Sequence, residues 1–429
     1  MTIQRLIDIL NGSGTDGWEL TQTVSRGWEF YFIRHLTDQN RCTDIETFRV
    51  KVFKLSPDRE YLGSASGTIP PQADDTEAAE IIRNLLLSAS FVKNPFYTLR
   101  TAAGAVPAGP GAPDAGDTAA VFLAAMAGIP ETPTEDVNSF ELFTTRKTIR
   151  LVTSEGIDLT ADVSEAMLEA VINARRADGT GEIELYRLYR SGGCDKATLE
   201  DDIGKAMRYG RDKLSARKTP ALGKADVVLS TDAALEVYYW FIDRMSAAYK
   251  VRGWSDWAVG TPIDPGCTGD RITVRSAAAL PNSSENLPFD AEGAPRRDMV
   301  IIRDNVPENY YGSRQFSQYL GLTDSFIPGN FTVEGGTASE EEIREGRYLE
   351  VVEFSDFQVD ALTGDIAGEI RLAYWHDGKT VRAVSGGSVS GNMKELVKTM
   401  RCTERTRQYN NLVIPAVTRL RNATVTGAA

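Results

Sequence analysis

Histidine is almost missing from this sequence. The 429 residues include two, His35 and His376, and neither HExxH nor HExxxH occurs. The usual pair of helical histidines around a catalytic zinc is therefore excluded. His35 ends the alternating run EFYFIRH, which predicts a strand, and His376 precedes Asp377-Gly378, a hairpin turn signal. Both positions favour a structural role over metal binding.

Paired cysteines and long apolar runs are also missing. The four cysteines (Cys42, Cys194, Cys267 and Cys402) are far apart and form no CxxC pair, which is typical of a reducing compartment. No apolar run approaches the roughly 20 residues of a membrane span. The N-terminal MTIQRLIDIL carries Asp8 in an amphipathic pattern, so it does not resemble a secretion signal. We expect a cytoplasmic protein without a membrane partner.

Basic charge is in deficit. Lys and Arg total 47 against 60 Asp and Glu, which gives a net charge of −13. A DNA-binding protein needs a basic surface to displace counterions from phosphates. Direct binding to nucleic acid is therefore not expected.

Several catalytic signatures fail on their spacing. The run GGSVSG places Val389 at the centre of its GSVSG, and GSASG places Ala65 there, so neither is a nucleophile elbow. A phosphate-binding G-x4-GK loop and a dinucleotide fingerprint after a strand are both absent from the sequence.

The order of predicted elements indicates an α+β protein with two domains. Residues 1–218 predict an N-terminal α/β-type domain of antiparallel strands and helices, with EAMLEAVINARR (165–176) as one helix. Residues 101–118 have 13 Ala, Gly or Pro among 18, which predicts a flexible loop. Residues 219–429 predict a mostly antiparallel β domain around a buried helix.

That helix is ALEVYYWFIDRMSAAY, residues 234–249. Its apolar side chains cover more than one face, which indicates burial. We expect Tyr239 and Trp240 to be mostly buried. Glu236, Asp243 and Arg244 are the side chains in it that could do chemistry, and an Asp beside an Arg favours a solvated or paired edge.

Four motifs in the second half follow a recognisable order: FDAEGAPRRD (289–298), PGNFTVEGG (328–336), TGDIAGEIRLAY (363–374) and GGSVSGNMKELVKTM (386–400). They resemble the TldD/PmbA family, the modulators of DNA gyrase, whose best-understood pair acts as a cytoplasmic zinc peptidase. In TldD a helix with HExxxH follows a strand like ADVVLS, and a cysteine ligand lies near the C-terminus. Here that helix position holds residues 239–244, YWFIDR. The chain is therefore more similar to the PmbA/TldE-type subunit, which lacks HExxxH.

The resemblance implies a non-catalytic subunit of a peptidase for unfolded peptides. It implies a dimer with a TldD-like subunit or with a second copy, zinc in the TldD-like partner, and no metal in this chain. Cys402 is then a remnant ligand or a packed thiol. The expected peptide cleft is lined by residues of the family motifs: Phe289, Asp290, Glu292, Gly293, Asn330, Ser388, Ser390 and Asn392. For each of these, shaping a tight turn is an equal alternative.

Two other functions are compatible with the residues. One is a stand-alone hydrolase that works through Asp290 and Glu292, with Cys402. The other is a non-enzymatic, dimeric peptide-binding protein.

Overall fold

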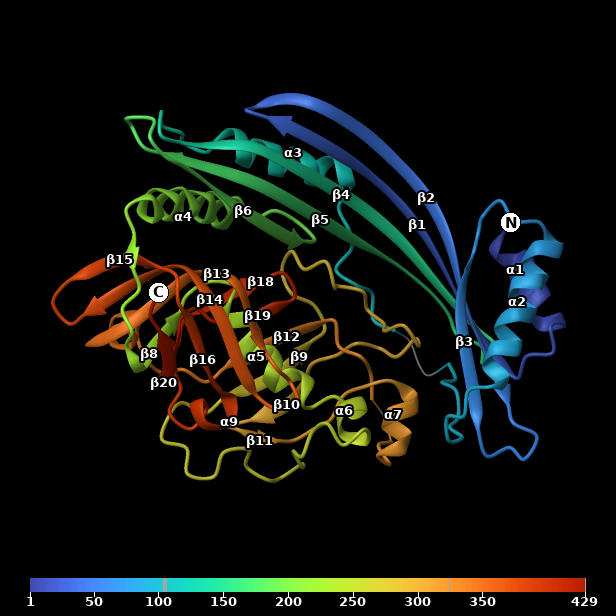
Figure 1. Cartoon of the computed structure of the whole chain (residues 1–429). Coiled ribbons are helices and arrows are strands. Elements are labelled where there is room, and N and C mark those ends of the chain that lie inside the picture. Colours follow the sequence, from blue (N-terminus) through green and yellow to red (C-terminus); the bar gives the residue numbers. More distant parts are fainter. Residues whose placement is uncertain (103–105, 324, 429) are drawn as a thin grey trace.

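The computed structural model describes residues 1–102, 106–323 and 325–428. It confirms the α+β class, with antiparallel strands and helices in the N-terminal half and a β-rich C-terminal half. The N-terminal strands arch over the C-terminal domain, with helices at both ends of the arch (Figure 1).

The arch is one antiparallel sheet whose strands are unusually long. Strand β2 has 20 residues and β1 has 17, and they pair from Gly17 opposite Phe53 to Ile33 opposite Leu36. Such long strands twist along their length, so the sheet turns different faces toward its neighbours. Within the described residues the order is β3-β2-β1-β4-β5-β6: β1 (Gly17–Ile33), β2 (Leu36–Leu55), β3 (Leu62–Ile69), β4 (Glu135–Thr153), β5 (Asp158–Arg175) and β6 (Glu182–Ser191).

Four helices cover the sheet in two pairs. At one end α1 (Ile3–Gly12) and α2 (Asp75–Ser90) enclose a core with Leu20, Phe48 and Val50. At the other end α3 (Ala115–Ala127) and α4 (Lys196–Leu214) pack on Phe140, Leu142, Leu168 and Ile172. Helix α4 lies between β6 and the C-terminal strands (Figure 1).

The helix predicted over residues 165–176 is wrong, because residues 165–175 belong to strand β5. Ala166, Leu168, Ala170 and Ile172 are buried while the residues between them are more exposed, which is the period of a strand. The Ala, Glu, Met and Leu content favours a helix locally. Pairing with β4 on one side and β6 on the other overrides that preference.

The predicted boundary of the loop over residues 101–118 is wrong at its C-terminal end, because the loop stops before residue 118. Helix α3 begins at Ala115, and the carboxylate of Asp114 accepts a hydrogen bond of 2.8 Å from the backbone N–H of Gly116. Residues 103–105 lie outside the described residues. Val106 packs beside Leu151 and Phe289, so this part of the segment is in contact with both domains.

The C-terminal domain contains two further sheets. Within the described residues the second sheet runs β11 (Val306–Pro307), β10 (Met299–Arg303), β9 (Thr273–Ala277), β12 (Asn330–Glu334), β19 (Leu412–Pro415) and β18 (Thr406–Tyr409). The third runs β13 (Arg347–Val359), β8 (Gly223–Leu229), β20 (Thr418–Thr426), β16 (Ser388–Asn392), β14 (Asp365–Asp377), β15 (Val381–Ser385) and β7 (Arg217–Lys218), with β17 (Arg401–Cys402) on β20. Most pairs are antiparallel, and β12–β19, β13–β8 and β15–β7 are parallel.

Helix α5 (Ala234–Asp243) lies in the main core, packed against residues of both C-terminal sheets. The predicted helix over residues 234–249 breaks after Asp243, because Ser246 forms a β-bridge with Tyr311 and the N–H of Ala247 donates to the Tyr311 carbonyl at 2.7 Å. The chain then continues as α6 (Ala247–Val251).

The remaining helices in the described residues are short: α7 (Arg314–Tyr319), α8 (Glu340–Ile343) and α9 (Met393–Leu396). No helix in the described part of the chain is long and apolar enough to cross a bilayer.

Polar pairs join the arch to the C-terminal domain along α4 and β6. Arg187 of β6 forms an ion pair with Glu353 of β13, and Arg407 of β18 forms one with Asp202 of α4. These side chains are half-buried or better, so the pairs lie within the contact between the domains.

The capping of α3 is testable with Asp114→Ala. Loss of a side-chain acceptor at a helix N-terminus costs about 1 kcal/mol of unfolding free energy. Denaturant unfolding of Asp114→Ala should show this loss, and Asp114→Asn, which keeps an acceptor, should stay close to the parent. Equal stability of Asp114→Ala and the parent would show that α3 is held by packing alone.

Candidate functional site

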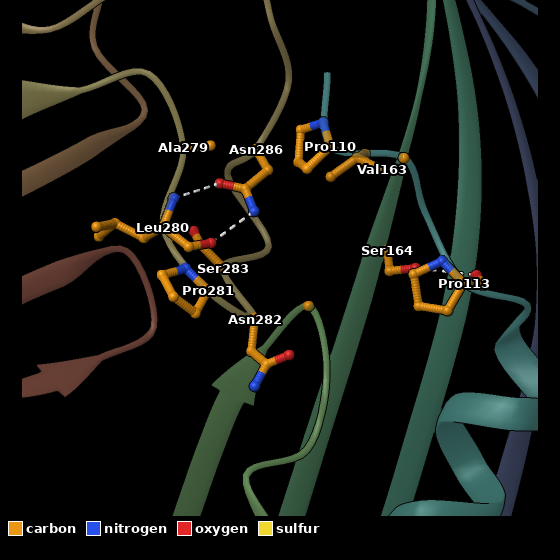
Figure 2. A pocket seen from close by; sticks show the side chains of 12 residues that line it. Pro110, Pro113, Val163, Ser164, Ala279, Leu280, Pro281, Asn282, Ser283 and Asn286 are labelled. Atoms are coloured by element: carbon orange, nitrogen blue, oxygen red, sulfur yellow. Dashed lines mark hydrogen bonds between the residues drawn. The ribbon is translucent and has the colours of Figure 1, made fainter. Parts of the chain in front are cut away.

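A cavity of about 320 Å³ lies between the arch and the C-terminal domain. Figure 2 shows Pro110 and Val163 on one side of it and Leu280, Pro281 and Asn282 on the other. Its walls come from β5, from the segment before α3, from the turn after β6 and from the loop after β9: Pro110, Gly111, Pro113, Val163, Ser164, Gly192, Ala279, Leu280, Pro281, Asn282, Ser283 and Asn286.

The wall formed by residues 279–286 is held by asparagines. The Asn286 side chain accepts from the Leu280 N–H at 2.9 Å and donates to the Leu280 carbonyl at 2.8 Å (Figure 2). Asn330 is fully buried behind this loop, and its Oδ1 accepts from the Ser283 hydroxyl at 2.5 Å. Asn330, expected to line a peptide cleft, therefore shapes the cavity wall from behind.

The two domains meet at the cavity through backbone as well as side chains. The N–H of Gly192 donates to the Asn282 carbonyl at 2.7 Å. A Cβ at Gly192 would lie 2.5 Å from the Ser283 carbonyl oxygen, so a glycine is required for this approach. On the opposite wall the Ser164 hydroxyl donates to the Pro113 carbonyl at 3.1 Å.

The chemistry of the cavity suits binding and not proton transfer. The described residues that line it are amides, hydroxyls, prolines and small apolar residues, with no acid, base or thiol among them. The polar side chains of Ser164, Ser283 and Asn286 already hydrogen-bond within the wall. What the cavity offers a ligand is shape, apolar contact and backbone hydrogen bonding.

The FDAEG motif forms a buried turn beside this cavity. Phe289 and Asp290 are 2% and 0% exposed. The Asp290 carboxylate accepts from the N–H groups of Glu292 and Ala294 at 2.9 Å each and of Ile327 at 2.8 Å. Gly293 has a φ of +82°, and a Cβ there would lie 3.0 Å from the Ile157 side chain. Phe289, Asp290 and Gly293 thus build a tight turn against the arch.

Glu292 lies in the same turn and is partly exposed. Its carboxylate accepts from the backbone N–H of Arg314 at 2.6 Å. Burial raises the pKa of Glu292, and the nearby Asp290 charge adds to this.

Ser388, Ser390 and Asn392 lie on β16, in the third sheet, and are half-buried. Ser388 donates to the Thr426 hydroxyl at 3.1 Å, and Asn392 accepts from the Lys394 N–H at 3.0 Å as the cap of α9. None of the three is among the described residues that line the interdomain cavity.

Aromatic packing and a buried cation fill the inner side of α5. Trp240 is 2% exposed and meets the Trp257 ring edge-on, with centroids 5.0 Å apart. The guanidinium of Arg244 lies over both indoles and donates to the carbonyls of Ala361 and Leu362 at 3.0 and 3.1 Å. Its ion-pair partner is the carboxylate of Asp256. Of the expected solvated or paired edge, Arg244 is paired, but with Asp256 and not with Asp243, and it is buried.

The outer side of α5 is half exposed and acidic. Glu236, Tyr239 and Asp243 recur along one helical face. Burial raises the pKa of Asp243 to about 6, and the Glu236 charge adds to the shift. Tyr239 is partly buried and packs against the main core, and Trp240 is buried, as expected. The fully buried tyrosine is Tyr238, whose hydroxyl lies 2.6 Å from that of Thr418.

Cys402 is packed in the core near Tyr238, with no exposed surface. Burial raises the pKa of its thiol, and the charge of Asp270 adds to the shift. A metal ligand needs the thiolate, which this surrounding disfavours. The residues here do not fit a zinc site, because the α5 side chain beside the thiol is the phenol of Tyr238 and not an imidazole, thiolate or carboxylate.

The two histidines contact residues outside α5. His35 is in the turn between β1 and β2, not within a strand, with Nε2 2.8 Å from the Glu131 carboxylate. His376 is near the end of β14 and stacks on Tyr348 with centroids 4.1 Å apart. In the three described ranges no three His, Cys, Asp or Glu side chains are grouped to hold a metal ion.

The cavity loop is the feature that sequence reasoning missed. The run ALPNSSEN (279–286) is dense in Pro, Asn and Ser, which predicts a loop with internal side-chain caps. The sequence pattern could therefore have predicted the loop. It could not have predicted that the loop meets Gly192 and Pro110, because this depends on the placement of the two domains.

Comparison with known proteins gives consistent relationships. Residues 222–427 match the family model of the PmbA/TldA metallopeptidase C-terminal domain. A curated relative, Metalloprotease PmbA of Escherichia coli O157:H7, is 24% identical over 249 residues, which are 54% of this chain and 54% of that protein. This match thus spans about half the length of the relative.

Solved structures share the fold over the whole chain. TldE from Thermococcus kodakarensis has a TM-score of 0.74 at 15% identity and covers 100% of both chains. A modulator of DNA gyrase from Bacteroides thetaiotaomicron has a TM-score of 0.77 at 16% identity, with 99% of this chain and 98% of that chain covered. A similar protein from Thermotoga maritima has a TM-score of 0.74 at 16% identity and 99% coverage of each chain.

The structural role of the FDAEG turn is testable with Gly293→Ala. A side chain in this left-handed conformation and against Ile157 should cost about 1–3 kcal/mol of unfolding free energy. The control is Gly204→Ala within α4, where a Cβ meets only the end of Arg208 at 3.9 Å and the change should be neutral or stabilising. A stable Gly293→Ala would contradict the turn geometry.

The packing of α5 is testable with Trp240→Ala. A large-to-small change in this core should cost about 3–5 kcal/mol, measured by denaturant unfolding. Trp254→Ala is the matched control, because Trp254 is 42% exposed and its loss should cost clearly less. Similar losses for the two variants would show that the inner side of α5 is not a packed core.

Proposed function

Because this chain belongs to the TldD/PmbA family, which is related to metallopeptidases, we propose that it is a catalytically silent subunit of a TldD/TldE-type peptidase. In this proposal it forms a dimer, with a TldD-like subunit or with a second copy, and works in the cytoplasm. The partner supplies the zinc, and this chain helps to enclose an unfolded peptide.

The inner side of α5 is the observation that carries this proposal. The family resemblance places the catalytic helix at residues 239–244, and the chain has Trp240 and Arg244 packed there against Trp257. A zinc site needs imidazole or thiolate groups that converge with room for water. Two indoles and a guanidinium that bonds to backbone carbonyls leave neither the donors nor the room.

A peptide-binding role is supported by two strands that lie at the ends of their sheets in the described residues. Strand β6 is at the edge of the arch, and β18 is at the edge of the second sheet. An extended peptide can add to such an edge through backbone hydrogen bonds, without a required sequence. Tyr186 and Leu188 on β6 are 55% and 43% exposed, so they offer apolar contacts to a chain that adds there.

The stand-alone hydrolase is favoured less. Asp290 accepts three backbone hydrogen bonds and is fully buried, so its carboxylate is committed to the turn. Cys402 is also without exposed surface. A nucleophile or general base must reach a substrate atom, and neither group has access to one.

Activity assays test the proposal. The purified chain alone should not cleave unfolded casein and should hold less than one zinc per chain. A family member that carries HExxxH should cleave faster with this chain present than alone. The two should elute together from a sizing column.

Chelator-sensitive cleavage by this chain alone would favour the hydrolase. One tightly held zinc per chain would also favour the hydrolase, if it is lost in Cys402→Ala and kept in the control Cys194→Ala. Absence of any effect on HExxxH relatives, with peptide binding retained, would favour the non-enzymatic peptide-binding alternative.

A further inference from the structure

The segment before α3 lies in a groove between the two domains. We call residues 106–113 of this segment, VPAGPGAP, the strap. The floor of the groove is the face of β5 that carries Leu159, Ala161 and Val163, because alternate residues of a strand share a face. One wall of the groove is formed by residues 279–289 of the C-terminal domain.

The strap contacts both the floor and the wall. A Cβ at Gly109 would lie 3.3 Å from the Pro288 ring, so the two backbones are close. The Ser164 hydroxyl of β5 donates to the Pro113 carbonyl at 3.1 Å. At the other end of the strap, Val106 packs on a small apolar cluster of both domains: Leu151, Ile157 and Phe289.

Few interactions hold the strap in place. In the described part of the chain, the backbone groups of residues 107–112 form no hydrogen bond with the rest of the protein. Apart from Val106, the side chains of the strap are those of Ala, Gly and Pro. A segment held by one apolar side chain and one hydrogen bond costs little to displace.

The strap also leaves part of the groove empty. The cavity of about 320 Å³ lies between Pro110, Gly111 and Pro113 of the strap and residues 279–286 of the wall (Figure 2). Residues 108–112 offer nothing larger than a proline ring to fill it. No described residue that lines this space carries a charge. The space therefore suits a bulky neutral side chain and opposes a charged one.

We propose that the groove binds an extended peptide with a bulky apolar side chain, and that the strap fills the groove until such a peptide displaces it. An aliphatic residue of the peptide takes the place of Val106 on the apolar cluster. A larger side chain occupies the cavity that Pro110 leaves empty, so the peptide buries more apolar surface than the strap does. The inference takes from the proposed function only that the ligand is an unfolded peptide.

The strap competes with a free peptide as a tethered ligand. A segment joined by a short linker has an effective concentration in the millimolar range at its own site. The apparent affinity of the parent for a free peptide is therefore reduced by the fraction of molecules in which the strap is bound. Removing the anchor at Val106 should raise that affinity.

Fluorescence anisotropy of labelled synthetic octapeptides with the full chain tests this. The probes are the strap sequence VPAGPGAP and two versions with Phe or Glu in place of its middle proline, VPAGFGAP and VPAGEGAP. Val106→Asp should release the strap, because a carboxylate is disfavoured on the apolar cluster. The variant should bind VPAGFGAP at least about tenfold more tightly than the parent does. It should bind VPAGEGAP at least about tenfold more weakly than VPAGFGAP.

Val259→Asp is the matched control, since Val259 is 52% exposed in the loop after α6. It should bind all three peptides as the parent does. Circular dichroism on heating shows whether each variant is folded. If Val106→Asp is not folded, the milder Val106→Ala should show the same order of affinities with a smaller gain over the parent.

Three results would overturn the proposal: equal affinity of the parent and the folded Val106 variant for VPAGFGAP, equal affinity of that variant for the Phe and Glu peptides, or no binding of any of them. These measurements use this chain alone. A failure here therefore leaves the cleavage and co-elution assays with an HExxxH relative, and with them the proposed function, unaffected.

Discussion

Burial of the Arg244 guanidinium constrains the whole C-terminal domain. A buried charge is costly unless it is hydrogen-bonded and paired. Here the cation takes two backbone carbonyls from the turn before β14, the carboxylate of Asp256 and the faces of Trp240 and Trp257. Trp240 lies on α5 itself and the other groups come from two further segments, so these contacts fix the rotation and depth of α5. The half-exposed face with Glu236 and Asp243 follows from that rotation.

The contact between the domains is of a different kind. Within each domain, apolar clusters dominate. In the described residues the arch meets the C-terminal domain through ion pairs, backbone contacts and two small apolar clusters, one around Phe289 and one where Tyr319 packs against Phe53 and Tyr97. Contacts of this kind are weaker and depend more on charge than a hydrophobic core does. The cavity walls come from both sides of this contact, so the shape of the cavity depends on how the domains are placed.

The fold class was predictable from the sequence, and so was the burial of Trp240, because both depend on local patterns. The conformation of residues 165–176 was not predictable, since these residues favour a helix and only pairing with β4 and β6 makes a strand. The start of α3 was hidden by the Ala and Gly that it shares with the loop before it.

The candidate site was predictable in part. Asn330 supports the wall of the interdomain cavity from behind through Ser283, and the FDAEG turn, in which Phe289 and Asp290 are buried, follows this wall loop along the chain. Their motif identifies a place in the fold and does not reveal which side chains are accessible. The pairing of Gly192 with Asn282 joins residues 90 positions apart, and no local pattern contains such information.

The way Arg244 is held limits how this chain could change in evolution. A histidine at position 244 would lose the bonds to Ala361 and Leu362 and leave Asp256 without its cation. A histidine at position 240 would remove the indole that packs on Trp257. Each single step toward a metal centre thus passes through a less stable intermediate, and the gain appears only when several substitutions coincide. Under the proposed function, this packing makes the silent state of the helix easy to reach by substitution and hard to leave.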